Sequence, residues 1–170
     1  YCASAASNSS YFHISNVSVG NLNYSSGDDG GYADYTAQTA DLAQGAAYTV
    51  SATEGTTQNY DQDWRVWIDF DQSGTFESSE LVLDFANTSN TTVSSGFNVP
   101  ATAALGTTRM RVSMKYFNIP AASQQACDSF TYGEVEDYTI NITEGTGVPS
   151  YCASSGSNSS YFHISNVSLN

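Results

Sequence analysis

The stretch that most constrains the fold is residues 63–80, with the sequence DWRVWIDFDQSGTFESSE. Its first half alternates as a β-strand does, because Trp64, Val66 and Ile68 share one face. Its second half has oxygen-bearing side chains at the spacing of a twelve-residue calcium loop. The predicted ligands, in chain order, are Asp69, Asp71, Ser73, Thr75, Glu77 and Glu80. Since both flanks are β-branched and aromatic, we predict a strand–loop–strand hairpin and not a pair of helices.

Calcium is the cofactor that this loop predicts. The ion takes six to eight hard oxygens at about 2.3–2.6 Å, and a short loop supplies them by wrapping around it. Gly74 permits the sharp turn, Thr75 offers its backbone carbonyl, and Glu80 closes the site with both carboxylate oxygens. Ser73 stands where such loops usually have Asp or Asn. The alternative is an acidic hairpin loop that holds no ion.

The charge balance limits the partners of the chain. Four Lys and Arg residues stand against 17 Asp and Glu residues, for a formal net charge of −13. Such a surface repels nucleic acid and anionic lipid and attracts metal cations. No run of the sequence approaches the roughly 18 apolar residues of a membrane span. Because the chain has no initiator Met and no basic leader, we expect a part of a longer polypeptide whose signal peptide lies elsewhere.

An internal repeat organises the chain. Residues 1–19 recur as residues 151–169 with three substitutions and no gap. We therefore predict a domain of residues 1–143, a linker of residues 144–150, and the first strand region of a second domain in residues 151–170. In a chain that ends there, the last segment would instead donate a strand to a neighbouring subunit. A local duplication of terminal strands within one domain is the remaining alternative.

The cysteines follow the same period. Cys2 and Cys127 fall in the first period, and Cys152 copies Cys2 in the next. An even number per period in an acidic, Ser- and Thr-rich chain indicates disulfides and an extracellular or cell-surface location. We predict a Cys2–Cys127 bond within the domain, which would add about 4–5 kcal/mol on the chain-entropy model. A Cys127–Cys152 bond between successive domains, or a metal held by two cysteines, is the alternative.

The other segments also predict β-structure. Residues 107–117 alternate most clearly, with Met110 and Val112 on one face and arginines on the other. The apolar parity of residues 11–19 changes midway, which predicts a bulge, and residues 21–31 are expected to form a turn-rich loop. Further strands are expected over residues 32–36, 46–53, 91–99 and 132–142. About eight to ten short strands without a helix predict an all-β fold, an antiparallel β-sandwich of Ig-like or jelly-roll-like type.

The last predicted strand carries the string GEVEDYTINI at residues 133–142, which resembles the closing signature of the GEVED domain. The resemblance covers nearly the whole period, since YC, GYADYT, VWIDFDQSGTFESSE, TRMRVSMKY and a cysteine before GEVEDY occur in the family's order. It implies an accessory β-sandwich attached to larger bacterial secreted or cell-surface proteins, some of them proteases, and no catalytic role. Phe70, Gln72 and Ser73 depart from the family, which often has Trp and an Asn- or Asp-rich turn there.

The carboxylates of the GEVED string need partners. Glu134 and Glu136 share one face of their strand, and Arg109 and Arg111 share one face of another strand. We predict ion pairs of these arginines with Glu134 or Glu136 across neighbouring strands. The alternative is a second cation site formed by aspartates, namely Asp137 with Asp28, Asp29 or Asp34.

No residue pattern predicts catalysis. His13 is the one histidine of the first period, and it lies in an apolar strand pattern away from any candidate nucleophile. The sequence has no GxSxG or HExxH motif and no phosphate-binding glycine loop. We therefore expect a protein that is not an enzyme, with His13 as a partly buried strand residue.

Asn-x-Ser/Thr motifs occur more often than chance predicts, which indicates a glycosylated, secreted surface. The alternative is a chance surplus in a chain rich in Ser and Thr. The candidate glycosylation sites are Asn8, Asn16, Asn23, Asn87, Asn90, Asn141, Asn158 and Asn166.

Two classes of function agree with these patterns. The first is a structural repeat that associates with itself end to end in an extracellular fibre, filament or adhesin, stabilised by calcium and a disulfide. The second is a carbohydrate- or protein-binding accessory module of a secreted enzyme, in which some of the two tryptophans and twelve tyrosines stack on sugars. The internal repeat favours the first class.

Overall fold

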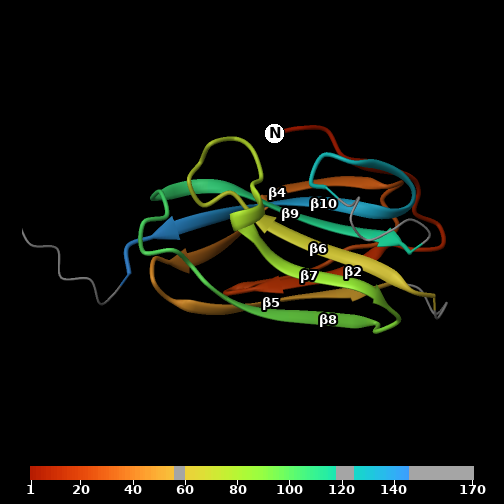
Figure 1. Ribbon diagram of the computed structural model, residues 1–170, viewed down its shortest axis with the longest axis horizontal. Coiled ribbons are helices and arrows are strands. Elements are labelled where there is room, and N and C mark those ends of the chain that lie inside the picture. The colour runs from red at the N-terminus through yellow and green to blue at the C-terminus, as the bar shows by residue number, and fades with distance from the viewer. Residues whose placement is uncertain (56–59, 118–124, 146–170) are drawn as a thin grey trace, which may run out of the picture.

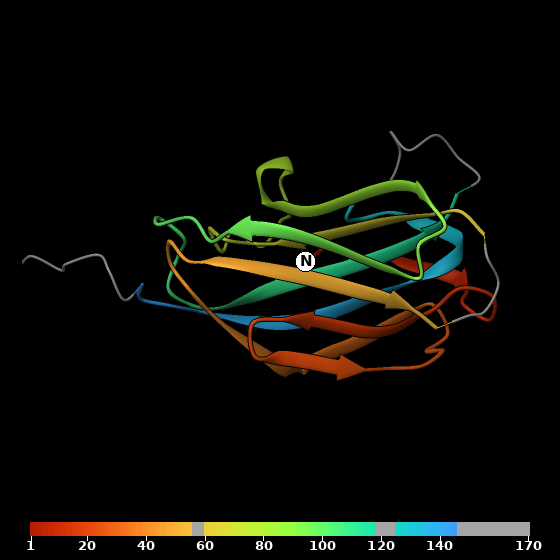
Figure 2. The same cartoon turned by 90° about the horizontal axis from the view of Figure 1, so that it is seen from below.

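The computed structural model describes residues 1–55, 60–117 and 125–145, which form a sandwich of two packed β-sheets (Figure 1, Figure 2). The prediction of an all-β sandwich is confirmed. The strands are β1 (Ala5–Asn8), β2 (Ile14–Val19), β3 (Leu22–Ser25), β4 (Tyr32–Ala43), β5 (Ala47–Glu54), β6 (Gln62–Ile68), β7 (Leu81–Thr88), β8 (Thr92–Asn98), β9 (Gly106–Tyr116) and β10 (Ser129–Thr143). A 3-10 turn, η1 (Ser78–Glu80), precedes β7. None of the described residues belongs to a helix with the length and apolar character of a membrane span.

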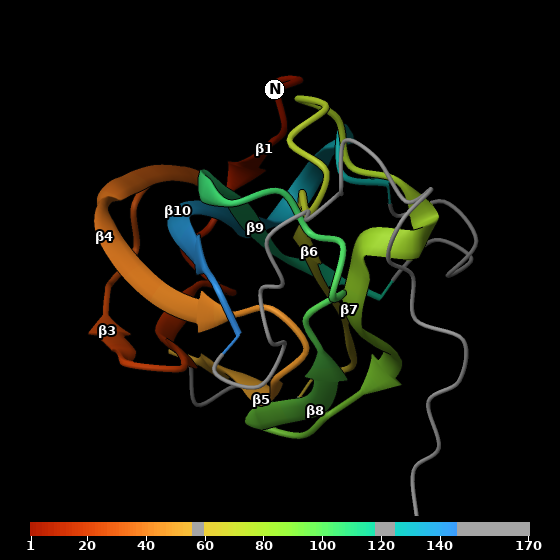
Figure 3. The same ribbon diagram turned by 90° about the vertical axis from the view of Figure 1, so that its left-hand side faces the viewer.

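The two sheets differ in strand direction. Within the described ranges, one sheet has the order β1-β10-β9-β6-β7, with β4 also paired to β10, and the other has the order β3-β2-β5-β8. Figure 3 views the sandwich from one end, with β4, β10, β9, β6 and β7 above β3, β5 and β8. β1 and β4 both pair with β10 in parallel, whereas β9 pairs with it antiparallel. The first sheet is therefore mixed, and the sequence predicts only its antiparallel part.

The core lies between the sheets and follows the predicted alternation. Trp64, Val66 and Ile68 of β6 are fully buried, and so are Met110 and Val112 of β9. The second sheet contributes, among others, Val17, Val50, Ala52 and Val93. Burial of these apolar faces against each other is the main force that holds the two sheets together.

The strands differ from the prediction at several points, among them β1, which lies outside every predicted strand. The strand predicted for residues 11–19 begins at Ile14 and carries the predicted bulge. The strand predicted for residues 32–36 continues through all of β4. β3 forms inside the segment predicted as a loop, because Leu22 is buried and Tyr24 packs against the core.

Candidate functional site

The predicted calcium loop joins β6 to β7 and lies beside the N-terminus (Figure 1, Figure 3). Asp69, Asp71 and Glu80 each place a carboxylate oxygen within 4.8 Å of the other two. Asp69 and Glu80 are buried, whereas Asp71 is exposed. Three of the six predicted ligands therefore converge in a cluster that reaches the surface.

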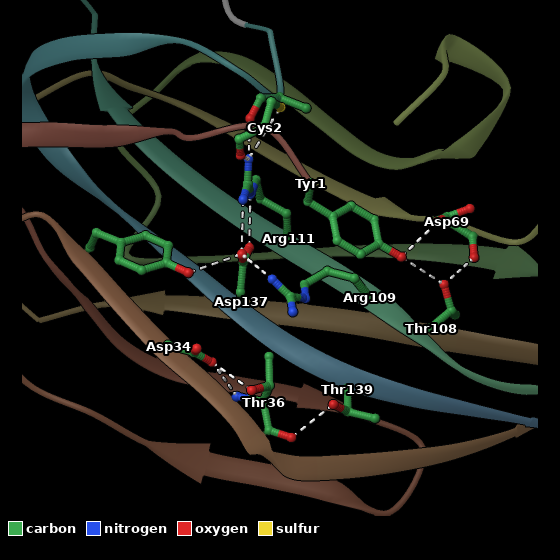
Figure 4. Close-up of polar contacts among 12 residues, drawn as sticks. Tyr1, Cys2, Asp34, Thr36, Asp69, Thr108, Arg109, Arg111, Asp137 and Thr139 are labelled. Carbon is green, nitrogen blue, oxygen red and sulfur yellow. Dashed lines mark hydrogen bonds and ion pairs between the residues drawn. The ribbon is translucent and has the colours of Figure 1, made fainter. Parts of the chain in front are cut away.

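Asp69 is oriented by the turn that follows it. The N–H groups of Ser73 and Gly74 donate to its two carboxylate oxygens at 3.1 and 3.0 Å. Gly74 has φ +82°, a left-handed conformation that confirms the predicted sharp turn. The Tyr1 hydroxyl donates to the same carboxylate at 2.6 Å, and Thr108 Oγ1 donates to the Asp69 carbonyl at 2.6 Å (Figure 4). Sequence reasoning missed Tyr1, because the spacing of the loop does not point to a residue 68 positions away.

Glu80 closes the loop at the end of η1. Its two oxygens accept the N–H groups of Phe70 at 2.7 Å and Glu77 at 3.1 Å. Burial, and secondarily the Glu77 side chain, raises the pKa of Glu80 to about 7. In contrast, the Thr75 hydroxyl lowers the pKa of the exposed Glu77 carboxyl. The charged form of Glu80 is disfavoured in the protein alone, so a cation beside it would stabilise that form.

The other three predicted ligands bond to one another. Ser73 Oγ lies 2.9 Å from Thr75 Oγ1 and 3.3 Å from Glu77 Oε1. Thr75 also donates to the Glu77 carboxylate. Carboxylate, hydroxyl and carbonyl oxygens are the ligands that calcium prefers, so the loop fits a hard divalent cation. Asp69, Asp71 and Glu80 are the residues that would hold it.

Arg109 and Arg111 pair with Asp137 and not with the predicted Glu134 or Glu136. Arg111 Nε and Nη2 each lie 2.8 Å from an Asp137 oxygen, and Arg109 Nη1 lies 3.1 Å from Oδ2 (Figure 4). The register of β9 and β10 places Asp137 opposite Arg111. Directly opposite residues share a face of the sheet, so both glutamates lie on the other face. The predicted arginine–glutamate pairs are therefore wrong.

The predicted aspartate site around Asp137 is not assembled in the described part of the chain. Both arginines hold the Asp137 carboxylate, which is fully buried. Asp28 accepts a hydrogen bond from the Ser9 hydroxyl, and Asp34 accepts one from Thr36 Oγ1 at 2.6 Å. Each of these three aspartates is therefore engaged by a different partner.

Asp29 instead lies near the two glutamates of β10. A carboxylate oxygen of Asp29 is within 4.8 Å of oxygens of Glu134 and Glu136. The N–H groups of Ile14 and Asp29 donate to the two oxygens of Glu134 at 2.8 and 2.9 Å. The Tyr138 hydroxyl donates to Glu136 Oε2 at 2.7 Å. Burial raises the pKa of Glu134 and of Glu136 to about 7.

The structure forms the predicted Cys2–Cys127 disulfide, with Cα atoms 5.4 Å apart. Arg111 Nη1 donates to the carbonyls of Cys2 at 2.9 Å and Ala126 at 2.7 Å, so the bond and the arginine belong to one cluster. Because Cys127 is bonded to Cys2, the alternative Cys127–Cys152 bond is not present. Cys152 lies outside the described residues.

The described glycosylation candidates differ in exposure. Exposed side chains are Asn23, Asn87 and Asn90, and half-buried ones are Asn8, Asn16 and Asn141. The side-chain amide of Asn16 donates to the Tyr24 carbonyl at 3.0 Å, and that of Asn141 donates to Asp41 at 2.8 Å. Since the amide nitrogen is the atom that carries a glycan, the exposed three are the better acceptors. Asn158 and Asn166 lie outside the described residues.

Comparison with known proteins agrees with the sequence resemblance. No curated protein matches the chain. The model of the GEVED domain matches residues 63–141, which contain the predicted calcium loop, Arg109 and Arg111, and the three carboxylates of β10. Over residues 63–141, this match supports the family that the sequence resembles, the GEVED domain family.

Proposed function

We propose that this chain is a structural repeat of an extracellular, glycosylated fibre, filament or adhesin. The observation that carries the proposal is the place of residues 1–19 in the sandwich. This segment supplies β1 to one sheet and β2 to the other, and its Cys2 bonds to Cys127. Residues 151–169 repeat its sequence, so they are suited to the same place in another copy of the domain.

The substitutions between the two segments are compatible with that place. The aligned pairs are Ala5 and Ser155, Ala6 and Gly156, and Val19 and Leu169. Ala6 and Val19 are buried, and both buried positions keep an apolar residue in the second segment. Hydrophobic residues of similar size are the exchanges that a packed core tolerates best.

The fibre is tested on native material. End-to-end particles in electron micrographs would support it, and compact monomers alone in microscopy and light scattering would overturn it. Mass spectrometry of denatured material then separates the two routes of assembly. A single species containing many repeats indicates a covalent array, and a chain of 18.1 kDa indicates strand exchange.

A cysteine variant tests the strand-exchange route directly. Cys2→Ser leaves Cys127 without its partner. In a strand-exchanged polymer, residues 151–169 of a neighbouring chain take the place of residues 1–19 and bring Cys152 to Cys127. A ladder on a non-reducing gel is expected, and the matched Cys2→Ser/Cys152→Ser variant should remove it. A Cys2→Ser protein that stays monomeric on this gel contradicts strand exchange.

Calcium would stabilise each domain through the loop of Asp69, Asp71 and Glu80. Chelation by EDTA is expected to lower the melting temperature, since a ligand at 100 times its Kd adds about 2.7 kcal/mol. Glu80→Gln should remove the part of the calcium-dependent stabilisation that this loop contributes. Calorimetric titration should then show one bound calcium fewer. Asp61→Asn, which removes an exposed charge elsewhere, is the control. A stoichiometry that Glu80→Gln leaves unchanged contradicts the site.

A carbohydrate-binding accessory module is the second candidate, and a surface hollow favours it. The hollow has a volume of about 390 Å³ and is lined by Tyr1, Tyr32 and Arg109, among others. The two tyrosines are 47% and 38% exposed, and aromatic faces beside polar groups are typical of sugar sites. A glycan array with the wild type and Tyr32→Ala tests it. Binding that the variant loses supports the module, and an array without hits excludes it.

A further inference from the structure

Asp29, Glu134 and Glu136 form an acidic cluster between the two sheets. Each contributes a carboxylate oxygen that lies within 4.8 Å of the other two. Glu134 and Glu136 are both 0% exposed, and Asp29, in the loop before β4, is exposed. The cluster is therefore a buried concentration of negative charge with one side at the surface.

The four Lys and Arg side chains of the protein are engaged elsewhere. They are Arg65, which pairs with Asp84; Arg109 and Arg111, which pair with Asp137; and Lys115, which lies 5.6 Å from the centre of the Phe130 ring. The acidic cluster thus has to be neutralised by something other than these cationic side chains, because isolated charges are not stable in the interior.

Neutral donors orient the cluster but leave one acceptor free. Backbone N–H groups of Ile14 and Asp29 engage both oxygens of Glu134, at 2.8 and 2.9 Å. Tyr138 engages Oε2 of Glu136 at 2.7 Å. Within the described residues, the other oxygen of Glu136, Oε1, is buried and accepts no hydrogen bond. The Ser26 hydroxyl lies near this side chain but donates to the Ile14 carbonyl at 2.9 Å instead. A buried carboxylate oxygen without a partner indicates a missing ligand.

We propose that Asp29, Glu134 and Glu136 bind a divalent cation of the calcium class, separately from the loop of Asp69–Glu80. Three carboxylates form the hard-oxygen donor set that this ion prefers, and the exposed side at Asp29 admits waters that complete its six to eight ligands. The ion ties β10 of one sheet to the loop before β4. Through the Ile14 N–H on Glu134, it also supports the start of β2 in the other sheet. This site does not depend on the proposed fibre.

Terbium luminescence on the full chain is the direct test. The Tyr35 hydroxyl lies 2.6 Å from Asp29 Oδ2, and Tyr138 contacts Glu136, so excited tyrosines stand next to the ion and sensitise its emission. The experiment uses a protein with the Glu80→Gln substitution, so that the loop of Asp69–Glu80 does not contribute to ion binding. In this background we expect saturable Tb³⁺ emission that Ca²⁺ displaces.

Added substitutions assign the site within that background. Glu136→Gln should weaken Tb³⁺ and Ca²⁺ binding roughly tenfold or more, whereas Asp61→Asn, an exposed charge elsewhere, should not change it. Unchanged affinity in Glu136→Gln, or no saturable emission in the background protein, overturns the proposal. Asp29→Asn, at the exposed member of the cluster, gives the same assignment if Glu136→Gln does not fold.

The melting temperature distinguishes a metal ligand from a purely structural residue, because the expected effect of Glu136→Gln differs between EDTA and Ca²⁺. With EDTA, Glu136→Gln should melt higher than its Glu80→Gln parent, because it removes a buried charge and keeps an acceptor for Tyr138. With Ca²⁺ the parent should gain stability and the double variant should not. A purely structural role of Glu136 would lower the melting temperature in both conditions, which contradicts the proposal.

Discussion

The two faces of β10 neutralise acidic side chains in different ways. On the outer face, Asp137 is fully buried and meets the guanidinium groups of Arg109 and Arg111. On the inner face, Glu134 and Glu136 are equally buried, and they accept hydrogen bonds from backbone N–H groups and a tyrosine hydroxyl. A carboxylate beside a guanidinium keeps its charge, whereas a buried one without a cation takes up a proton or a metal. One strand therefore separates a buried carboxylate that has cationic partners from two buried carboxylates that have none.

The largest effect is expected on the outer face. Arg111→Met keeps the aliphatic stem and removes the guanidinium. Asp137 then keeps only Arg109 and the Tyr32 hydroxyl, and the carbonyls of Cys2 and Ala126 lose their donor. Breaking a buried ion pair from one side costs about 3–5 kcal/mol. Urea unfolding should show this loss. Arg65→Met is the control, because the Asp84 side chain is 49% exposed and such pairs contribute about 1 kcal/mol or less. Equal losses of unfolding free energy in Arg111→Met and Arg65→Met would contradict the expected difference between a buried and an exposed ion pair.

On the inner face, pH should change stability in the metal-free protein. The pKa values of Glu134 and Glu136 are raised from 4.5 to about 7, so the folded protein binds more protons than the unfolded chain between these values. The resulting stability is fully present below about pH 4.5 and is lost as the pH rises through 7. With EDTA, the free energy of unfolding should fall by roughly 1–3 kcal/mol from pH 5 to pH 8. Glu136→Gln should flatten this slope, and a wild-type stability that rises over this range contradicts the prediction.

The two inner glutamates should themselves respond differently to amidation. Both oxygens of Glu134 accept backbone N–H groups, so Glu134→Gln places an amide donor against a donor. We expect a loss of about 1–3 kcal/mol in EDTA, the usual effect of an unsatisfied buried group. Glu136→Gln should show no such loss, because hydroxyl groups and not backbone N–H groups lie against that side chain, and a hydroxyl can accept from an amide as well as donate to it. Urea unfolding of Glu134→Gln and Glu136→Gln measures the difference. Losses of the same size would show that the two glutamates do not differ in how their oxygens are hydrogen-bonded.

The smallest effect is expected at Arg109. Its side chain is 27% exposed and makes one contact with Asp137, which keeps its two bonds to Arg111. Arg109→Met should therefore cost about 0.5–1 kcal/mol. The same urea experiment measures it. A loss as large as that of Arg111→Met would show that both arginines are required to hold the buried carboxylate.

Sequence reasoning found the part of the site that lies on one continuous segment. The loop of Asp69–Glu80 contains its candidate ligands, its glycine turn and the carboxylate of Glu80, so spacing alone predicts the cluster. Tyr1 and Thr108 support Asp69 from distant segments, and no local pattern predicts them. The parallel pairing of β1 and β4 with β10 was missed for the same reason, because it is a contact between remote parts of the chain.

The arginine–glutamate error had a different origin, because the signal was in the sequence. Glu134 and Glu136 have the same parity as Tyr138, Ile140 and Ile142, which form the apolar face of the strand and are buried. That parity directs both glutamates to the interior and leaves Asp137 for the arginines. The prediction paired the side chains only because each pair shares one face of its strand, and it did not use the alternation of the apolar residues. A strand that buries two carboxylates on its core-facing side is rare enough to indicate a specific role.

The Cys2–Cys127 bond also determines how a domain in a tandem array would carry tension. Cys2 precedes β1, and Cys127 lies just before β10 begins. A pull applied to both ends of the domain passes from Cys2 through the sulfur bridge into β10 and leaves after Thr143. The loop between the cysteines, with a sequence separation of 125, is outside this load path. Because β10 is already extended, each oxidised domain of such an array would add a short segment that resists lengthening. Reduction would transfer the load to β1, whose parallel bonds to β10 are then sheared together.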